Sequence, residues 1–362
     1  MVLTVGYDAR AAVLDPDRGL GRVAREHVCA FAGRSDVDLV VFVPRGAPLG
    51  PSLEGLQERI VRVPHPPRGA FLFDRPVWRR VLDRHPVDVL HLPAWGVPPG
   101  LGLPVVATLH DVTPLRYPDA IPSGRVRRRA VQRLETYRRA TLVHAVSRST
   151  AHDAVHCLGI PPDRVRVVPN GVAAPTGGEP AERRDHVLYV GGPDPHKRVD
   201  LLARLWCGSR ARDLPPLVVA GGASGHPAIR EAAERCPERV RVAGTVDDGA
   251  LARLYGTAQV LVLPSLWEGF GLPVLEAMAH GAVPVVTACS SLPEAGGGAA
   301  LYVPASAPPA AWAEAVRRIV SDQALASRLR DAGRARVAAC SWDRVAEALV
   351  AVYREARILA PS

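Results

Sequence analysis

The sequence predicts an α/β protein with two Rossmann-like domains, each built on a doubly wound parallel sheet. Two observations predict this fold. Short Val- and Leu-rich runs alternate with helical patterns, and the alternation occurs in two successive series separated by a polar Pro/Gly segment. Continuous apolar runs are typical of parallel strands that are buried on both faces. The length of 362 residues also exceeds that of one ordinary hydrophobic core, which favours two domains.

The two series of apolar runs predict the strands in order. The first series gives strands at residues 3–6, 39–43, 60–63, 87–92, 105–109, 142–145 and 165–168, with helical periodicity at residues 23–31 and 126–139. The second series gives strands at residues 186–190, 217–220, 240–243, 260–263, 283–286 and 301–303. Two successive series of this kind favour two doubly wound domains over one.

The domain boundary is expected in the polar segment 172–184, directly after the tight turn at Pro169-Asn170-Gly171. This divides the chain into an N-terminal domain (1–172), a C-terminal domain (173–341) and a last amphipathic helix within residues 342–362. Sheets of this class bind ligands at the carboxyl ends of their strands. We therefore expect the active site in a cleft between the two domains.

Composition and charge narrow the class of protein. Hydrophobic residues make up 48% of the chain and charged residues 22%, as in soluble globular proteins. The formal net charge of +9 would attract anionic partners. Its source is almost entirely arginine, with Lys197 as the only lysine, and this bias suits a high-GC bacterium. We therefore expect no nucleic-acid partner.

Cysteine spacing and the N-terminus indicate a cytoplasmic protein. The six cysteines are scattered without a C-x-x-C pair, so we expect neither a zinc site nor a disulfide framework. The first residues predict a strand rather than a signal peptide, and no apolar run is long enough to span a bilayer. The arginine-rich helix at residues 125–139 could touch the inner face of the membrane. A solvated helix face is the favoured alternative.

The most informative candidate site is the turn Gly269-Phe270-Gly271, which joins the strand at 260–263 to a helix that begins near Pro273. Proline suits helix entry, and the N–H groups at a helix start bind anions. Glu268 precedes the turn and Glu276 follows it, so the site suits a ligand with both phosphates and hydroxyls, such as a sugar nucleotide. Each acid alone could be a solvated or dipole-complementing group. A glycosidase pair is disfavoured, because that chemistry needs carboxyls on opposing walls of a sugar site.

A second candidate site follows the first strand of the second series. Here Lys197 and Arg198 could neutralise a diphosphate, with the lysine as a point charge and the arginine as a bidentate fork. A surface basic pair is the alternative, but the position after the first strand favours phosphate binding.

Two further candidates lie in the first domain. His110 ends a strand and could donate to a sugar hydroxyl or shuttle a proton, although it could also be a satisfied histidine. The flexible loop Gly19-Leu20-Gly21-Arg22 is expected to open a helix. It lacks the third glycine of a dinucleotide fingerprint, which disfavours NAD. Asp15-Pro16-Asp17 resembles a metal-holding D-x-D, but we interpret it as a proline turn and expect no metal.

These motifs, in this order, resemble the retaining glycosyltransferases of family 4, which have the GT-B fold. The resemblance covers nearly the whole chain, and its most specific motif is E-x7-E, from Glu268 to Glu276. The segments Ala243-Gly244-Thr245-Val246 and Ser290-Ser291-Leu292-Pro293-Glu294 and the last helix also match. In the family that helix crosses back onto the first domain.

The resemblance implies roles for individual residues. Lys197 would bind the donor diphosphate, Glu276 the ribose hydroxyls and Glu268 the transferred sugar. The implied catalytic residues are His110, Glu268 and Lys197. The implied donor-binding residues are Gly21, Arg22, Gly192, Lys197, Arg198, Thr245, Val246, Glu268, Gly269, Phe270, Gly271, Leu272 and Glu276. Many members carry an arginine where this chain has Gly192, and Arg198 could compensate for its loss.

The resemblance also implies the reaction. A sugar would pass from a GDP-, UDP- or TDP-linked donor to a hydroxyl of a glycan, lipid-linked or small-molecule acceptor, with retention and without metal or cofactor. Mannosyl or a related hexosyl transfer is favoured. The leaving phosphate oxygen would take the acceptor proton while the domains close to exclude water. The alternatives are a 2-epimerase or phosphorylase of the same fold, or a catalytically silent sugar-nucleotide-binding protein. The sequence does not indicate an oligomeric state.

Overall fold

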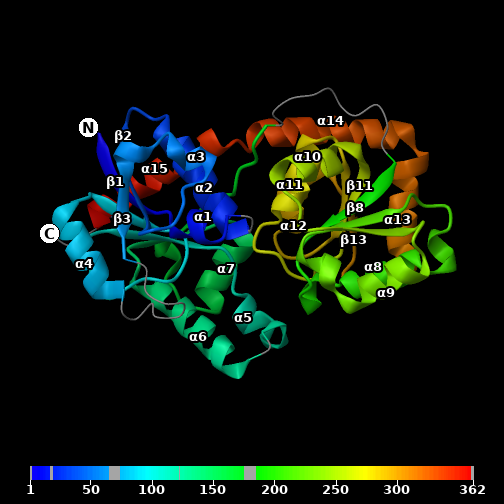
Figure 1. The fold of residues 1–362 in the computed structure, drawn as a ribbon, viewed down its shortest axis with the longest axis horizontal. Helices are drawn as coiled ribbons and strands as arrows, with labels where there is room; N and C mark the ends of the chain where they lie inside the picture. Colours follow the sequence, from blue (N-terminus) through cyan, green and yellow to red (C-terminus); the bar gives the residue numbers. More distant parts are fainter. Residues whose placement is uncertain (1, 17–18, 65–73, 122, 175–184, 360–362) are drawn as a thin grey trace. The chain divides into compact units, whose positions relative to one another are not determined.

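The computed structural model describes residues 2–16, 19–64, 74–121, 123–174 and 185–359. The chain divides into two compact units, one made of Met1–Gly171 with Trp342–Ser362 and the other of Val172–Ser341. Each unit holds one parallel sheet with helices on both of its faces (Figure 1). The predicted α/β fold class with two Rossmann-like sheets is confirmed.

The sheet of the first unit has the strand order β3-β2-β1-β4-β5-β6-β7, with every neighbouring pair parallel. Its strands are β1 (Leu3–Asp8), β2 (Val37–Pro44), β3 (Ile60–Val63), β4 (Val89–Leu92), β5 (Val105–Leu109), β6 (Leu142–Ala145) and β7 (Val165–Val167). Strands β4, β5 and β6 are buried along their whole length. The edge strands β3 and β7 are partly exposed, because each has a neighbour on one side only.

Helices cover both faces of this sheet. They are α1 (Arg10–Leu14), α2 (Gly19–Ala32), α3 (Pro51–Glu54), α4 (Asp74–Arg84), α5 (Thr113–Arg116), α6 (Gly124–Glu135), α7 (Arg148–His156) and the C-terminal α15 (Trp342–Leu359). On one face α15 packs against α2, β4 and β5. On the other face, Trp78 of α4, Leu134 of α6 and Ala154 of α7 join one apolar cluster with the strands. The last helix therefore belongs to the core of the first unit.

The helix expected over residues 126–139 is shorter than predicted. The α-helix α6 ends at Glu135, and Thr136–Arg139 form a 3₁₀ turn. The Thr136 hydroxyl donates to the carbonyl of Arg133 at 2.6 Å, in competition with the helix ladder. Tyr137 is buried and donates to the carbonyl of Thr108 at 3.0 Å. Tertiary contacts therefore end the helix before its apolar periodicity does.

A buried chain of hydrogen bonds ties α15 to this sheet. Tyr353 contacts His91 Nδ1 at 2.5 Å, His91 Nε2 contacts Thr108 Oγ1 at 2.6 Å, and Thr108 Oγ1 contacts His144 Nδ1 at 2.9 Å. His144 Nε2 contacts the carbonyl oxygen of Val168 at 2.7 Å. Since a carbonyl oxygen only accepts, His144 Nε2 carries the proton, and His144 Nδ1 accepts from the Thr108 hydroxyl. That hydroxyl accepts from His91 Nε2, and His91 Nδ1 accepts from the Tyr353 hydroxyl. Both imidazoles are neutral in this arrangement.

The sheet of the second unit has the order β10-β9-β8-β11-β12-β13, again entirely parallel. Its strands are β8 (His186–Val190), β9 (Leu217–Ala220), β10 (Val240–Gly244), β11 (Ala258–Leu263), β12 (Val283–Thr287) and β13 (Leu301–Val303). Because β8 and β11 are neighbours at its centre, the loops that follow these two strands leave the same edge of the sheet.

The helices of the second unit are α8 (Val199–Trp206), α9 (Pro227–Arg235), α10 (Asp248–Thr257), α11 (Leu272–Ala279), α12 (Leu292–Gly296), α13 (Pro309–Ser321) and α14 (Gln323–Ala339). Helix α8 packs against α9 and α13, whereas α11 packs against α10 and α14. Figure 1 shows α8 and α9 on one face of the sheet and α10 and α11 on the other.

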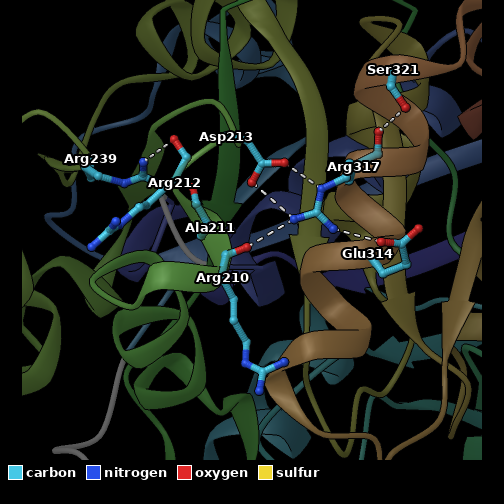
Figure 2. Close-up of polar contacts among 8 residues, drawn as sticks. All are labelled: Arg210, Ala211, Arg212, Asp213, Arg239, Glu314, Arg317 and Ser321. Atoms are coloured by element: carbon cyan, nitrogen blue, oxygen red, sulfur yellow. Dashed lines mark hydrogen bonds and ion pairs between the residues drawn. The ribbon is translucent and has the colours of Figure 1, made fainter.

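Arg317 joins α13 to the loop before β9, and Arg239, directly before β10, contacts the same loop (Figure 2). The Arg317 guanidinium donates from Nε to Asp213 Oδ2 at 2.6 Å and from a terminal nitrogen to Glu314 Oε2 at 2.7 Å. Arg239 donates to the carbonyl of Arg212 at 2.7 Å. The hydrogen bond from Arg317 lowers the pKa of Asp213. Arg317 is thus matched with two carboxylates, and Arg239 with a backbone carbonyl.

Candidate active site

Lys197 and Glu268 meet at the carboxyl edge of the second sheet. Lys197 ends a 3₁₀ turn after β8, and Glu268 lies in the turn after β11. Lys197 Nζ donates to Glu268 Oε2 at 2.6 Å, and their side chains are 19% and 11% exposed. The sequence placed these residues in two separate motifs. The structure brings them together because the strands before them are neighbours.

Two serines after β12 hold the backbone of Glu268. The Ser290 hydroxyl accepts from the N–H of Glu268 at 3.1 Å, and the Ser291 hydroxyl donates to the carbonyl of Glu268 at 2.8 Å. The N–H of Leu266 donates to the carbonyl of His196 at 2.7 Å, which ties this turn to the turn of Lys197. The turn that carries Glu268 is therefore fixed from two sides.

Gly271 forms the start of α11. Its φ of +95° is in the left-handed region, and a Cβ there would lie 2.9 Å from Leu292 Cδ2. Glycine is required for both reasons. The helix begins at Leu272 with proline in its first turn, as the sequence predicts. Its first N–H groups lie directly after the turn that holds Glu268, which is the arrangement of an anion site.

Glu276 is held in place by Tyr255 of α10. The Tyr255 hydroxyl donates to Glu276 Oε2 at 2.7 Å, and the tyrosine is almost completely buried. Its ring stacks on His280 at 5.7 Å, and His280 Nδ1 donates to the carbonyl of Glu276 at 2.9 Å. Sequence analysis missed Tyr255. Its place in an amphipathic helix looked like that of any core residue.

Arg198 faces a different partner from the one expected. Its backbone is left-handed at φ +54°, and its guanidinium donates to the carbonyl of Ala305 at 2.8 Å. Burial raises the pKa of the Cys289 thiol, Glu268 raises it further and Arg198 opposes this effect. The guanidinium therefore lies within electrostatic range of the Cys289 thiol. A contact between Arg198 and a diphosphate remains a prediction.

The loops after β8, β9 and β10 approach one another at glycines. A Cβ on Gly221 would lie 2.9 Å from the carbonyl oxygen of Gly191, and one on Gly222 would lie 3.7 Å from the Cα of Gly192. The carbonyl of Gly244 accepts from the N–H of Gly221 at 2.8 Å. After Gly244 the chain continues with Thr245, which is exposed, and Val246, which is half-buried.

In the first unit, His110 directly follows β5 and has a defined tautomer. Its Nε2 contacts the carbonyl oxygen of Pro93 at 2.9 Å, so Nε2 carries the proton and Nδ1 can accept a hydrogen bond. Burial lowers the pKa of His110, which favours the neutral form. The expected donation to a sugar hydroxyl does not fit this tautomer, whereas acceptance from a hydroxyl does.

The predicted flexible loop at Gly19–Arg22 is helical instead. Helix α2 begins at Gly19 and includes Gly21 and the half-buried Arg22. A Cβ on Gly21 would lie 2.0 Å from the carbonyl oxygen of Asp15. This close approach, rather than loop flexibility, explains the glycine.

The remaining predictions concern metals and membranes. Within the described residues, no group of three or more His, Cys, Asp and Glu side chains could hold a metal ion. Asp15 is described, whereas Asp17 lies outside the described residues. Arg125, Arg127, Arg128 and Arg129 of α6 are exposed. Across the described part of the chain, no helix is long and apolar enough to cross a bilayer.

Comparisons with known proteins agree on one family. A family model described as Glycosyl transferases group 1 matches residues 184–322, and one described as Glycosyltransferase Family 4 matches residues 18–176. The O-antigen chain mannosyltransferase B of Escherichia coli is 30% identical over 54% of this chain and 56% of its own length. The D-inositol 3-phosphate glycosyltransferase of Kineococcus radiotolerans is 31% identical over 65% of this chain and 61% of its own length. The chain thus matches less than two thirds of either relative.

A solved structure has the same fold. HepE of Anabaena, in complex with UDP and glucose, superposes with a TM-score of 0.69 over 97% of this chain and 99% of that chain, at 16% identity. This likeness confirms the GT-B fold class.

Proposed function

Since the chain belongs to the family 4 type of the group 1 glycosyltransferases, we propose that it moves a hexosyl group from a nucleoside-diphosphate sugar to an acceptor hydroxyl. The contact of Lys197 with Glu268 beside the start of α11 carries the proposal. It puts a cation for the diphosphate and a carboxylate for sugar hydroxyls at one place.

Different residues of the second unit bind different parts of the donor. Lys197 and the first N–H groups of α11 stabilise the charge that develops on the departing diphosphate. Glu276, held by Tyr255, accepts from the ribose hydroxyls, and Glu268 accepts from the transferred sugar. Donor binding then exchanges the contact of Lys197 with Glu268 for contacts with the ligand.

Retention follows from front-face transfer. The leaving phosphate oxygen takes the proton of the acceptor hydroxyl as that hydroxyl attacks the anomeric carbon and the bond to phosphate breaks. His110 Nδ1 accepts from a hydroxyl of one of the two sugars. Lys197 supplies the positive charge, so the proposal requires no metal. Turnover that persists in excess EDTA supports this part, and a strict metal requirement would direct attention back to Asp15 and Asp17.

Similar proteins suggest the substrates. One relative is named for mannosyl transfer, another for an inositol phosphate, and HepE binds UDP. We propose GDP-, UDP- or TDP-linked hexoses as donors, and a glycan, lipid-linked or small-molecule acceptor. All six cysteines are unbridged thiols, which suits work in the reducing cytoplasm.

A thermal-shift screen with GDP, UDP and TDP tests the donor site, because a tight ligand raises the unfolding temperature by mass action. Product analysis with the matching sugar nucleotide then tests transfer. Nucleoside diphosphate that appears only when acceptor is present supports a transferase. A sugar product inverted at C2 would favour a 2-epimerase, sugar 1-phosphate formed from a glycan and inorganic phosphate would favour a phosphorylase, and binding without any turnover would favour a silent binding protein.

A further inference from the structure

Two cysteines of the second unit lie at matching ends of neighbouring helices. Cys207 is the cap residue at the end of α8, and Cys236 is the cap residue at the end of α9. The two helices pack against each other. Both cysteines are half-buried free thiols, so a small reagent can reach them. We call these two residues the thiol pair.

One backbone carbonyl brings the thiol pair together. The carbonyl oxygen of Ala232, in the last turn of α9, accepts from the backbone N–H of Cys236 at 2.9 Å. The same oxygen accepts from the thiol of Cys207 at 3.6 Å. The thiol that ends α8 therefore lies against the last turn of α9, beside Cys236.

The segments that follow the two cysteines are also joined to each other (Figure 2). Arg239, which comes shortly after Cys236, donates to the carbonyl of Arg212 at 2.7 Å and also to the carbonyl of Ala211. Both carbonyls belong to the loop that follows Cys207. The ends of α8 and α9 are therefore held together by contacts that do not involve sulfur.

The two thiols are close enough to affect each other's ionisation. Burial, a hydrogen bond with the Cys236 thiol and the charge of its thiolate together raise the pKa of Cys207 to about 11. Arg235 and Arg239 oppose this rise in pKa, because nearby cations favour a thiolate. Among the described residues, carboxylates and arginines rather than a second thiol are the charged groups that shift the pKa values of Cys29, Cys157 and Cys289.

We propose that the thiol pair is a modification site, at which a low-molecular-weight disulfide such as glutathione disulfide forms a reversible cross-link between Cys207 and Cys236. Two half-buried thiols that meet at one carbonyl, on helix ends that other contacts already hold together, have a high effective concentration at each other. The inference is independent of the proposed function, because it involves neither donor nor acceptor.

The reaction consists of two thiol–disulfide exchanges. The thiolate of one cysteine attacks a sulfur of the reagent, breaks its S–S bond and releases one small thiolate. The thiolate of the other cysteine then attacks the protein sulfur of this mixed disulfide, which forms the cross-link and releases a second small thiolate. The released thiolates take up the two protons that the cysteines lose, and the reagent gains the two electrons that the pair gives up. The raised pKa of Cys207 slows the exchange at neutral pH, so the rate should rise with pH.

The cross-link would stabilise the second unit. It closes the stretch of chain from Cys207 to Cys236, which contains β9 and α9. Closing such a loop lowers the conformational entropy of the unfolded chain and so favours the folded state. Lys197 lies just before the start of α8 and Cys207 lies at its end, so the new bond forms at the end of this helix that is remote from the candidate active site.

Mass spectrometry of the wild-type protein tests the cross-link directly. The protein is incubated with glutathione disulfide at about pH 8, where exchange is faster, and the remaining thiols are alkylated before digestion with trypsin. Cleavage after arginine releases Cys207 in the peptide 205–210 and Cys236 in the peptide 236–239. We expect these two peptides to be joined, and to separate after treatment with dithiothreitol.

Thermal melts with two matched variants test the stabilisation. The oxidised wild type should unfold at least about 5 °C above the reduced wild type. Cys29→Ser, which removes an exposed thiol outside the pair, should show the same rise, whereas Cys236→Ser should show none. The proposal is overturned if glutathione disulfide leaves Cys207 and Cys236 unjoined or as separate glutathione adducts, or if it joins them to other cysteines. It is also overturned if the oxidised and reduced wild-type proteins unfold at the same temperature.

Discussion

The hydroxyl of Tyr353 donates a 2.5 Å hydrogen bond to Nδ1 of His91, although the two residues are 262 positions apart. Tyr353 lies on α15 and His91 on β4, and both are completely buried. The contact joins the last helix of the chain to the centre of the first sheet. It requires a neutral His91, since a proton on Nδ1 would remove the acceptor and bury a charge.

The first unit should lose stability in mild acid. Burial lowers the pKa of His27 and His91 well below the usual value and lowers the pKa of His144 to about 4. The unfolded chain takes up these protons near pH 6.5, so below that pH the unfolded state binds more protons. The stabilisation is therefore complete above about pH 7 and is lost as the pH falls from about 6.5 to about 4. For His144 alone the loss is about 3 kcal/mol.

Urea unfolding at several pH values between about 7 and 5 measures this slope. The variant His85→Gln is the control, because it removes an exposed imidazole and leaves the buried histidines in place. Equal free energies of unfolding across this range would contradict the prediction.

Lys197→Ala should weaken nucleoside-diphosphate binding by about ten- to a hundredfold, the equivalent of one charge-assisted hydrogen bond. It should also leave Glu268 without its 2.6 Å partner. Calorimetric titration with UDP and GDP provides the measurement. Arg204→Ala, which removes an exposed cation from the nearby α8, should leave both affinities unchanged. Unaltered affinity and turnover in the Lys197→Ala protein would contradict the assignment of Lys197 to the donor diphosphate.

Tyr255→Phe should weaken the binding of nucleoside diphosphates, because phenylalanine has no hydroxyl to donate to Glu276 and orient its carboxylate. The expected cost is about 1–2 kcal/mol, because the lost hydrogen bond goes to a charged group. Inorganic pyrophosphate, which has no ribose, should bind the variant and the wild type equally. Tyr302→Phe also removes one donated hydrogen bond, to the carbonyl of Gly297, and serves as the control. Equal losses for UDP and pyrophosphate would point to general damage rather than to positioning of Glu276.

Gly21→Ala should lower the stability of the fold much more than Gly19→Ala, although both residues lie in the first turn of α2. A Cβ at position 21 would meet the carbonyl oxygen of Asp15 at 2.0 Å, whereas one at position 19 meets nothing within 4 Å. We expect Gly21→Ala to cost about 2 kcal/mol or more, since backbone must move to relieve the clash. Gly19→Ala should change stability by less than about 1 kcal/mol. Thermal melts of the two variants make the comparison, and equal melting temperatures would contradict it.

The strands could be predicted from the sequence because local composition determines them. Buried parallel strands are continuous apolar runs, and β5, β6, β8 and β9 begin and end at the predicted residues. The same holds for α15, whose amphipathic pattern runs uninterrupted from Trp342 to Leu359. The glycine turn before α11 was predictable because Gly and Pro restrict the backbone directly.

Contacts between distant residues could not be predicted in this way. Nothing local marks Tyr255 as the partner of Glu276, or Tyr353 as the partner of His91. The short length of α6 depends on buried contacts of Thr136 and Tyr137, which apolar periodicity does not encode.

The ion pair of Lys197 with Glu268 makes the candidate active site chemically unique within the protein. Lys197 is the only lysine of the sequence. An acylating reagent therefore finds one side-chain amine, together with the α-amino group at the N-terminus. A fluorophore ester would therefore modify one side chain besides the α-amino group, without any engineered cysteine or tag. A ligand that draws Nζ away from Glu268 would change the rate of that modification, so the natural sequence already contains a reporter of its own occupancy.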